Sequence, residues 1–371
     1  MSTVRVLYGE LRTGKITGVI DATGTNWAQT LNAAGSIDGV TVPDDVLARF
    51  NLRQGAAAAR CFLAVEIDDR IQEAGPIWSR SYDWGKGQAT FGAAGLWSLF
   101  DHRKVVPVLA AGQYVQNVTT TFTGADLGDI ARQLVAQAGS HTGGDLPIVL
   151  PAARPGAAHT ESWPGWQLSK LGEQLTQLTQ RQSAAPDIAF RPRRKSTDRR
   201  FIEWVMLTGT AAASQLSQGG SDWVFDTTLR RGPVLGIGTD EDATAMGMRG
   251  WETGNGTEAS TLISVAEDDT LIAAGYPLLE QEENRSTVEL QPTLDAYAAQ
   301  LVARSARPVE IWKLTVHASA AAEVQAGDYA QVITSGHPWL GTGSRRMRVQ
   351  KKSGDLTEKV VLDMYPLQAT L

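Results

Sequence analysis

Short apolar runs separated by turn residues occupy the first third of the chain. Runs such as Cys61–Ile67, Gln88–Phe91 and Val105–Leu109 alternate with Gly, Asp and Pro. Closely spaced short strands of this kind are typical of small barrels and sandwiches. Residues 1–118 are therefore predicted to form an N-terminal β-barrel-like domain, and Leu96–Phe100 is expected to add a helical turn at its end.

A helical pattern begins near Thr123. From Ala125 to Ala138 the apolar residues recur every three or four positions, which predicts a helix with one buried face. Thr123 and Asp126 resemble a capping box, in which a side chain binds the first free N–H groups of a helix. A second apolar stripe predicts another helix from Trp166 to Gln182.

Two strands are predicted after these helices, at Asp187–Phe190 and Phe201–Leu207. They would form a hairpin whose loop is 191–200. Residues 119–210 are therefore expected to be an α+β module of two helices and a hairpin.

The second half of the chain returns to a strand pattern. Residues 211–305 are predicted as a β-rich segment with one helix at Thr293–Ser305, where Pro292 suits the first helical position. Alternating apolar residues predict a C-terminal antiparallel β domain over 306–371. The fold class expected for the whole chain is α+β with strands dominant.

Composition limits the classes of function. The chain has 371 residues, a net charge of −6 and one cysteine, Cys61. A nucleic-acid binder usually carries a basic surface, so the chain as a whole is not expected to be one. A single cysteine excludes an intramolecular disulfide and a zinc-binding thiol cluster. No leader peptide or membrane-spanning run is recognised, so synthesis in a bacterial cytoplasm is expected.

The segment from Gly9 to Lys15 fits the spacing of a phosphate-binding loop. The next residue should be Ser or Thr to hold magnesium, but it is Ile16, and the β-branched residues that follow favour a strand rather than a helix. We interpret the segment as a hairpin turn. No cofactor-binding residues are expected.

Catalytic motifs are also not recognised. The five histidines form no zinc-hydrolase motif, and the acidic groups at 240–242 and 280–283 have the composition of solvated loops. We expect no enzyme activity, no catalytic residues and no metal site. The 11 tryptophans, among them the Trp163/Trp166 and Trp78/Trp84 pairs, leave open a surface that stacks on sugars.

The predicted hairpin loop is the candidate binding segment. Clustered Arg and Lys bind phosphate and carboxylate groups, so the segment could face an acidic partner or passing DNA; a solvated hairpin tip is the alternative. The candidate residues are Arg191, Arg193, Arg194, Lys195, Arg199 and Arg200.

The order of these parts resembles a known family. The helical segments Phe122–Ala131 and Trp166–Leu175, the run Gly143–Ile148 between them and the hairpin strands are similar to the minor tail proteins of siphophages that infect actinobacteria, the Gp37-like group. Later segments, such as Thr293–Ala298 and Gly327-Asp328, are similar to tail-hub proteins.

The resemblance implies a structural subunit of a virion, located at the tail tip. Such a baseplate hub is a homotrimeric ring at the end of the tail tube, and two small β-barrel-like domains in each subunit flank the α+β module. The implied partners are other copies of the chain, a distal tail protein, a tape measure protein, other minor tail or receptor-binding proteins and, during ejection, genomic DNA. A receptor- or glycan-binding tail protein is the alternative, and a cell-wall hydrolase is a more remote one.

Overall fold

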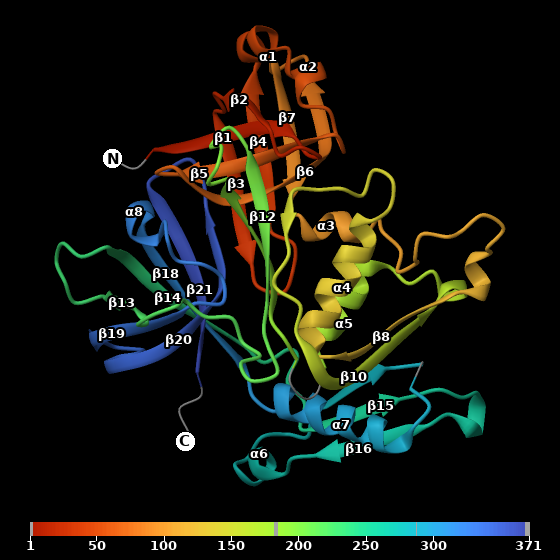
Figure 1. Cartoon of the computed structure of the whole chain (residues 1–371). Coiled ribbons are helices and arrows are strands. Elements are labelled where there is room, and N and C mark those ends of the chain that lie inside the picture. The colour runs from red at the N-terminus through yellow and green to blue at the C-terminus, as the bar shows by residue number, and fades with distance from the viewer. Residues whose placement is uncertain (1–2, 182–184, 287, 368–371) are drawn as a thin grey trace. The chain divides into compact units, whose positions relative to one another are not determined.

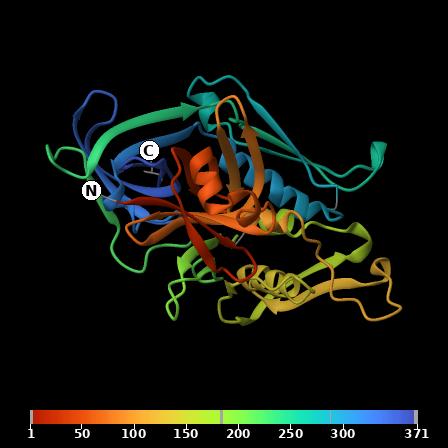
Figure 2. The same ribbon diagram turned by 90° about the horizontal axis from the view of Figure 1, so that it is seen from above.

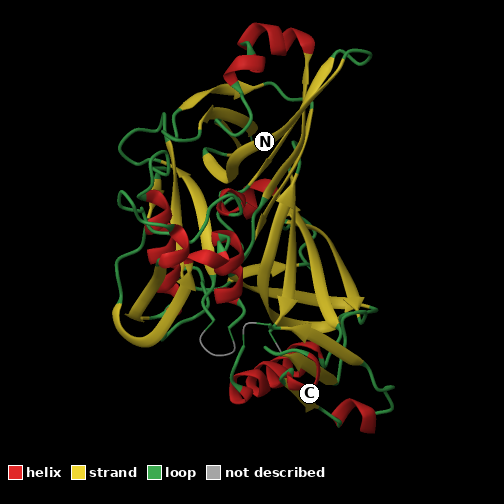
Figure 3. Cartoon of the chain, turned by 90° about the vertical axis from the view of Figure 1, so that its right-hand side faces the viewer, coloured by secondary structure: helices red, strands yellow, loops and turns green. Residues whose placement is uncertain are grey.

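The computed structural model describes residues 3–181, 185–286 and 288–367 (Figure 1). Strands make up 44% of the structure and helices 19%, so the expectation of a β-dominated fold is confirmed (Figure 3). None of the helices in the described ranges is long and apolar enough to cross a membrane.

The chain divides into two compact units. The first comprises residues 1–237 and 313–371, and the second comprises 238–312. The boundaries expected from the sequence, at 118, 210 and 305, stay a prediction.

Seven strands and two short helices form the N-terminal part of the first unit. They are β1 (Val4–Glu10), β2 (Ile16–Ile20), β3 (Gly24–Thr30), β4 (Ser36–Pro43), α1 (Asp44–Phe50), α2 (Leu52–Gly55), β5 (Cys61–Ile67), β6 (Arg70–Asp83) and β7 (Gln88–Ala94). The order across the sheet is β3-β4-β7-β6-β5-β1-β2. All seven residues of β5 are buried, which explains its continuous apolar run. β1 and β2 pair as an antiparallel hairpin. The Gly9–Lys15 segment therefore contains the turn of this hairpin, as predicted, and not a phosphate-binding loop.

Later strands of the chain extend this same sheet. They are β13 (Trp223–Asp226), β14 (Val234–Asp242), β18 (Val309–His317), β19 (Tyr329–His337), β20 (Gly341–Gly354) and β21 (Lys359–Pro366); α8 (Ala318–Ala321) lies between β18 and β19. β20 pairs with β21 and also with β3, which joins the two ends of the chain in one sheet. The pairing among the described strands runs as an open path, and the two barrel-like domains stay a prediction.

The part of the first unit between β7 and β13 has its own core. Its elements are α3 (Trp97–Phe100), η1 (Val115–Asn117), β8 (Thr119–Ala125), α4 (Leu127–Gly139), β9 (Ile148–Val149), β10 (Pro155–Pro164), η2 (Gly165–Gln167), α5 (Leu171–Thr179), β11 (Ile188–Arg194) and β12 (Ile202–Thr208). Apolar residues of α4 and α5 pack with Ile188 and Met206 of the hairpin. The predicted first helix and hairpin are therefore confirmed, as is the helical turn at α3.

Three local predictions for residues 97–208 were wrong. Val105–Leu109 is not a strand: Pro107 has no N–H to donate, and Val108 is 58% exposed. The second helix begins at Leu171 rather than Trp166, because Leu168 takes a left-handed conformation that interrupts it; the predicted end at Gln182 lies outside the described residues. Asp126, not Thr123, caps α4 by accepting a hydrogen bond from the Asp129 amide at 2.7 Å.

The second unit is a three-stranded sheet covered on one face by a helix. Its elements are β15 (Arg249–Thr253), η3 (Glu258–Ser260), β16 (Ile263–Glu267), α6 (Thr270–Ala273), β17 (Glu280–Asn284) and α7 (Gln291–Ser305). The predicted third helix is confirmed as α7, with Pro292 in its first turn, and its apolar residues Leu294, Tyr297 and Leu301 are buried.

Candidate functional site

The basic segment is shorter as a loop than the sequence suggested. Arg191, Arg193 and Arg194 belong to β11, so only residues 195–201 form the turn that leads to β12. β11 is an edge strand, where Pro192 can omit a ladder hydrogen bond at little cost. The prediction of a ten-residue loop was therefore wrong, because the strand continues through the proline.

Acidic groups of the same chain neutralise most of these cations. The guanidinium of Arg194 lies 2.5 Å from Glu66, that of Arg193 lies 2.8 Å from Glu203, and that of Arg200 lies 2.7 Å from Asp198. The hydrogen bonds from Arg200 lower the pKa of the Asp198 carboxyl to about 2. Arg199 is 3.8 Å from Asp69, and Lys195 is exposed. Whether the turn faces DNA or an acidic partner stays a prediction.

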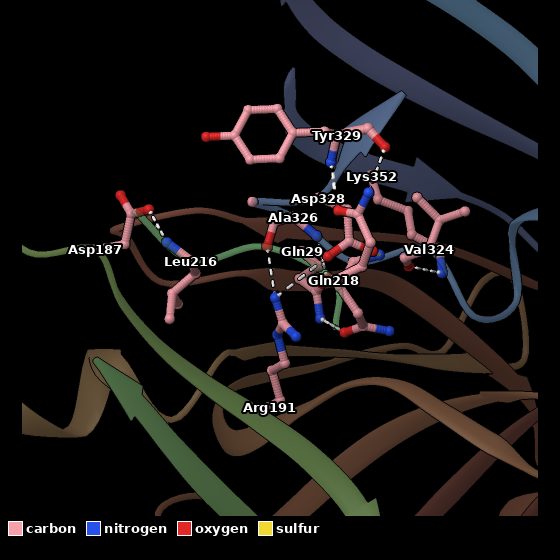
Figure 4. Close-up of polar contacts among 12 residues, drawn as sticks. Gln29, Asp187, Arg191, Leu216, Gln218, Val324, Ala326, Asp328, Tyr329 and Lys352 are labelled. Carbon is pink, nitrogen blue, oxygen red and sulfur yellow. Dashed lines mark hydrogen bonds and ion pairs between the residues drawn. The ribbon is translucent and has the colours of Figure 1, made fainter. Parts of the chain in front are cut away.

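Arg191 differs from its neighbours because it points into the interior, toward the chain near Asp328 (Figure 4). It donates a hydrogen bond to the Ala326 carbonyl at 3.0 Å, and its guanidinium lies 3.8 Å from the Asp328 carboxylate. Asp328 in turn accepts hydrogen bonds from the Gln325 amide at 2.9 Å and from the Trp223 indole at 3.0 Å. The loop before β19 is therefore fixed to β11 and β13 by polar contacts.

Gln29 and Lys352 fix the same loop to β3, β6 and β20 (Figure 4). The Gln29 side chain accepts from the Ala326 amide at 2.9 Å and donates to Gln325 at 3.0 Å. Lys352 is 1% exposed and donates to the Val324 carbonyl at 2.8 Å and to Gln72. Burial lowers the pKa of the Lys352 ammonium to about 7.

We call the cluster formed by Gln29, Arg191, Asp328 and Lys352 with their partners the polar junction. The linker after the β11–β12 hairpin also belongs to it. Gln218 accepts from the Tyr329 amide at 2.8 Å, and Asp187 accepts from the Leu216 amide at 2.7 Å and from Arg348. A cavity of about 20 Å³ beside Gln29, Glu73 and Arg191 has room for one water molecule but not for a substrate. The junction thus connects distant segments of the first unit, a structural role. The residue types gave no signal of it, because its partners are far apart in the sequence.

The residues considered for catalysis lie outside the polar junction. Cys61 is buried and donates to the Gly55 carbonyl at 3.1 Å. In the second unit, Glu280 and Glu283 form ion pairs with Arg249 and Arg285. In the described parts of the chain, the His, Cys, Asp and Glu side chains form no group of three or more suited to a metal ion.

The tryptophans divide into buried and exposed groups. Trp163 is 6% exposed, whereas its predicted partner Trp166 is 65% exposed. Trp84, at the turn of the β6–β7 hairpin, is 85% exposed, and Trp339 is 76% exposed. The exposed rings are available to a partner, and those in the cores are not.

Comparison with known proteins gives a match in structure only. No protein-family model matches the sequence, and no curated protein matches it in sequence. The chain is similar in fold to the tail protein from Neisseria meningitidis MC58, with a TM-score of 0.57 and 15% identity over 98% of this chain and 96% of the other.

Two further solved structures match over nearly the whole chain. They are the 43 kDa tail protein of prophage MuSo2 from Shewanella oneidensis (TM-score 0.55, 12% identity, 98% of each chain) and the prophage tail protein gp18 from Listeria monocytogenes EGD-e (TM-score 0.50, 10% identity, 99% and 95%). The chain therefore has the fold of phage tail proteins.

Proposed function

We propose that this chain is a structural virion protein of a bacteriophage tail tip. The observation that carries the proposal is the extent of the match in fold: 98% of this chain aligns with 96% of the Neisseria tail protein. Nearly the whole of each chain therefore belongs to the shared fold. We assign this chain a structural role in the tail on that basis.

The more specific proposal is a subunit of a homotrimeric baseplate hub that closes the distal tail tube. Its partners would be other copies of the chain, the distal tail protein, the tape measure protein and other minor tail or receptor-binding proteins. The pairing of β20 with β3 supports a rigid subunit, because it joins the N-terminal and C-terminal strands in one sheet. In this proposal the two ends of that sheet provide the two barrel-like domains of the hub.

The basic turn would face the lumen of this hub. Lys195, Arg199 and Arg200 are exposed and could contact genomic DNA in the lumen, where phosphate attracts cations. Arg191 and Arg194 are engaged with the interior of the subunit, so the proposal does not assign them to the DNA surface.

A receptor- or glycan-binding role is the second candidate. The exposed rings of Trp84 and Trp339 favour it, since sugars stack on exposed aromatic surfaces. A purified glycan that quenches the tryptophan fluorescence of the wild-type chain, but not that of the Trp84→Ala variant, would support this role.

Purified phage particles test the main proposal. The chain should be detected in them by mass spectrometry, and gold-labelled antibodies against it should bind at the distal end of the tail. A chain that is found only in lysates, or only along the tail tube, would contradict a tail-tip role.

A further inference from the structure

The second unit contains the single Asn-Gly step of the chain, Asn255-Gly256. It lies in the turn that joins β15 to β16 at one end of the three-stranded sheet (teal in Figures 1 and 2). Both residues are exposed and lie outside the helices and strands. Asn-Gly steps are common in turns, and asparagine is among the residues that degrade chemically in proteins.

The backbone of this turn requires glycine at position 256. The φ angle of Gly256 is +133°, a conformation that residues with a side chain rarely adopt. A Cβ atom at this position would also lie 2.4 Å from the Ser260 carbonyl oxygen. The residue after Asn255 therefore has no side chain that could shield its own backbone nitrogen from the Asn255 side chain.

The backbone nitrogen of Gly256 is also free of hydrogen bonds. In the described ranges no acceptor binds its N–H, whereas the Asn255 amide donates to the Val288 carbonyl at 2.8 Å. The Asn255 side chain donates from Nδ2 to Glu289 Oε1 at 3.2 Å. An unengaged backbone nitrogen and an exposed side-chain amide are therefore adjacent in this turn.

We propose that Asn255 is a site of spontaneous deamidation. The Gly256 nitrogen attacks Cγ of Asn255, a new C–N bond closes a succinimide ring, and the bond from Cγ to Nδ2 breaks. Nδ2 leaves as ammonia and takes up the proton that the Gly256 nitrogen loses. A water molecule then opens the ring and restores the Gly256 N–H. Opening at Cγ gives aspartate, and opening at the backbone carbonyl carbon gives isoaspartate, in which the main chain runs through the former side chain.

The products change the contacts of the turn. In aspartate an acidic oxygen replaces the donor Nδ2, so the hydrogen bond to Glu289 is lost and two carboxylates of like charge lie close together. Isoaspartate adds a carbon to the main chain and displaces the Asn255 carbonyl, which accepts from the Leu262 amide at 3.0 Å. The turn should therefore loosen as the protein ages, whatever role the chain has in a tail.

Peptide mapping of the folded, full-length chain tests this site. The protein is incubated at pH 8 and at pH 6, digested at acidic pH, where the reaction is slow, and measured by mass spectrometry. Asn117 is the matched control in the same molecule: it is exposed, but the next residue is Val118, whose amide donates to the Val115 carbonyl at 3.3 Å. Asn255→Gln is the second control, because its longer side chain would have to close a larger ring.

Deamidation at Asn255 should exceed deamidation at Asn117 by ~10-fold or more, which corresponds to a barrier lower by about 1.4 kcal/mol. It should be faster at pH 8 than at pH 6, because the attacking nitrogen must lose its proton. The product should contain both aspartate and isoaspartate. Hydrogen exchange at the Leu262 amide should become faster in the incubated wild type, but not in Asn255→Gln, whose folding circular dichroism would establish.

Three results would overturn the inference. The first is deamidation at Asn255 no greater than at Asn117. The second is conversion to aspartate without isoaspartate, because direct hydrolysis of the side chain would then be the route. The third is unchanged exchange at Leu262 in fully converted protein, which would show that the modification does not loosen the turn.

Discussion

Arg194 on β11 binds Glu66 on β5, and the Glu66 side chain is completely buried. The distance from Nε of the arginine to Oε1 of the glutamate is 2.5 Å. This ion pair connects the β11–β12 hairpin to the N-terminal strands. Part of the basic segment therefore stabilises the subunit, and the cations left for a partner are those of the turn.

Arg194→Ala is expected to destabilise the chain. It leaves a buried carboxylate without its cation, a change that typically costs about 3–5 kcal/mol. Arg200→Ala is the matched control, because Arg200 and its partner Asp198 are near the surface and such a pair contributes about 0–1 kcal/mol. Urea unfolding of both variants measures the difference. Equal loss of stability in the two variants would contradict a structural role for Arg194.

Glu73 should make stability depend on pH. Burial raises the pKa of its carboxyl from 4.5 to about 8. The folded state therefore holds a proton that the unfolded state releases near pH 4.5, so the stabilising contribution is complete below that pH and is lost as pH rises through 8.

Glu73→Gln is expected to remove this pH dependence. The variant should match the wild type near pH 4.5 and become more stable than it by a few kcal/mol at pH 8. Urea unfolding at pH 4.5, 6.5 and 8 checks this, with Glu358→Gln at an exposed position as the control. A constant difference between Glu73→Gln and wild type at all three pH values would refute the explanation.

Asp126 combines a helix cap with an ion pair. It accepts from the Asp129 amide at 2.7 Å and from Arg154 at 2.8 Å. Burial alone would raise the pKa of the Asp126 carboxyl, but these hydrogen bonds hold it below its ordinary value of 3.8. Its contribution to stability is therefore present above pH 3.8 and is lost as pH falls below that value.

Asp126→Ala should cost at least the ~1 kcal/mol of a lost cap, and more because Arg154 loses its partner. Asp126→Asn keeps the capping oxygen and should retain part of the stability at pH 7. Thermal unfolding compares the two variants. An alanine variant as stable as the asparagine variant would show that the cap contributes nothing.

Gly75 has no space for a side chain. A Cβ atom at this position in β6 would lie 1.8 Å from the Ala94 carbonyl oxygen, so Gly75→Ala requires the backbone to move. We expect a loss of roughly 1–3 kcal/mol or more from overpacking. Gly236→Ala is the control, since a Cβ there meets no atom within 4 Å. If both alanine variants melted at the wild-type temperature, the close approach of Gly75 to Ala94 would be contradicted.

Periodic elements could be predicted from the sequence because their patterns report burial directly. Each such pattern lies within one continuous segment of the sequence. Examples are the apolar stripes of α4 and α7 and the apolar run of β5. The start of α5 was missed because it depends on the left-handed conformation of one residue, Leu168. The prediction of a strand at Val105–Leu109 was wrong because a short apolar run can also lie on an exposed surface.

The burial of Lys352 shows a second limit of the sequence. Lys351 and Lys352 are adjacent and identical in type, yet only Lys352 is fully buried. A β-bulge between Val349 and Lys351 changes which face of the sheet the following side chains occupy. Nothing in the residue types marks that bulge. The partners of Lys352 and of Arg194 come from strands far away in the sequence, so neither contact could be predicted from the segment itself.

Electron cryo-microscopy of the intact tail tip tests the central claim most directly. We predict that three copies of this chain form a ring at the distal end of the tail tube. Density for the chain only in peripheral fibres, or no density for it in the particle, would contradict the claim that it is a tail-tip hub protein.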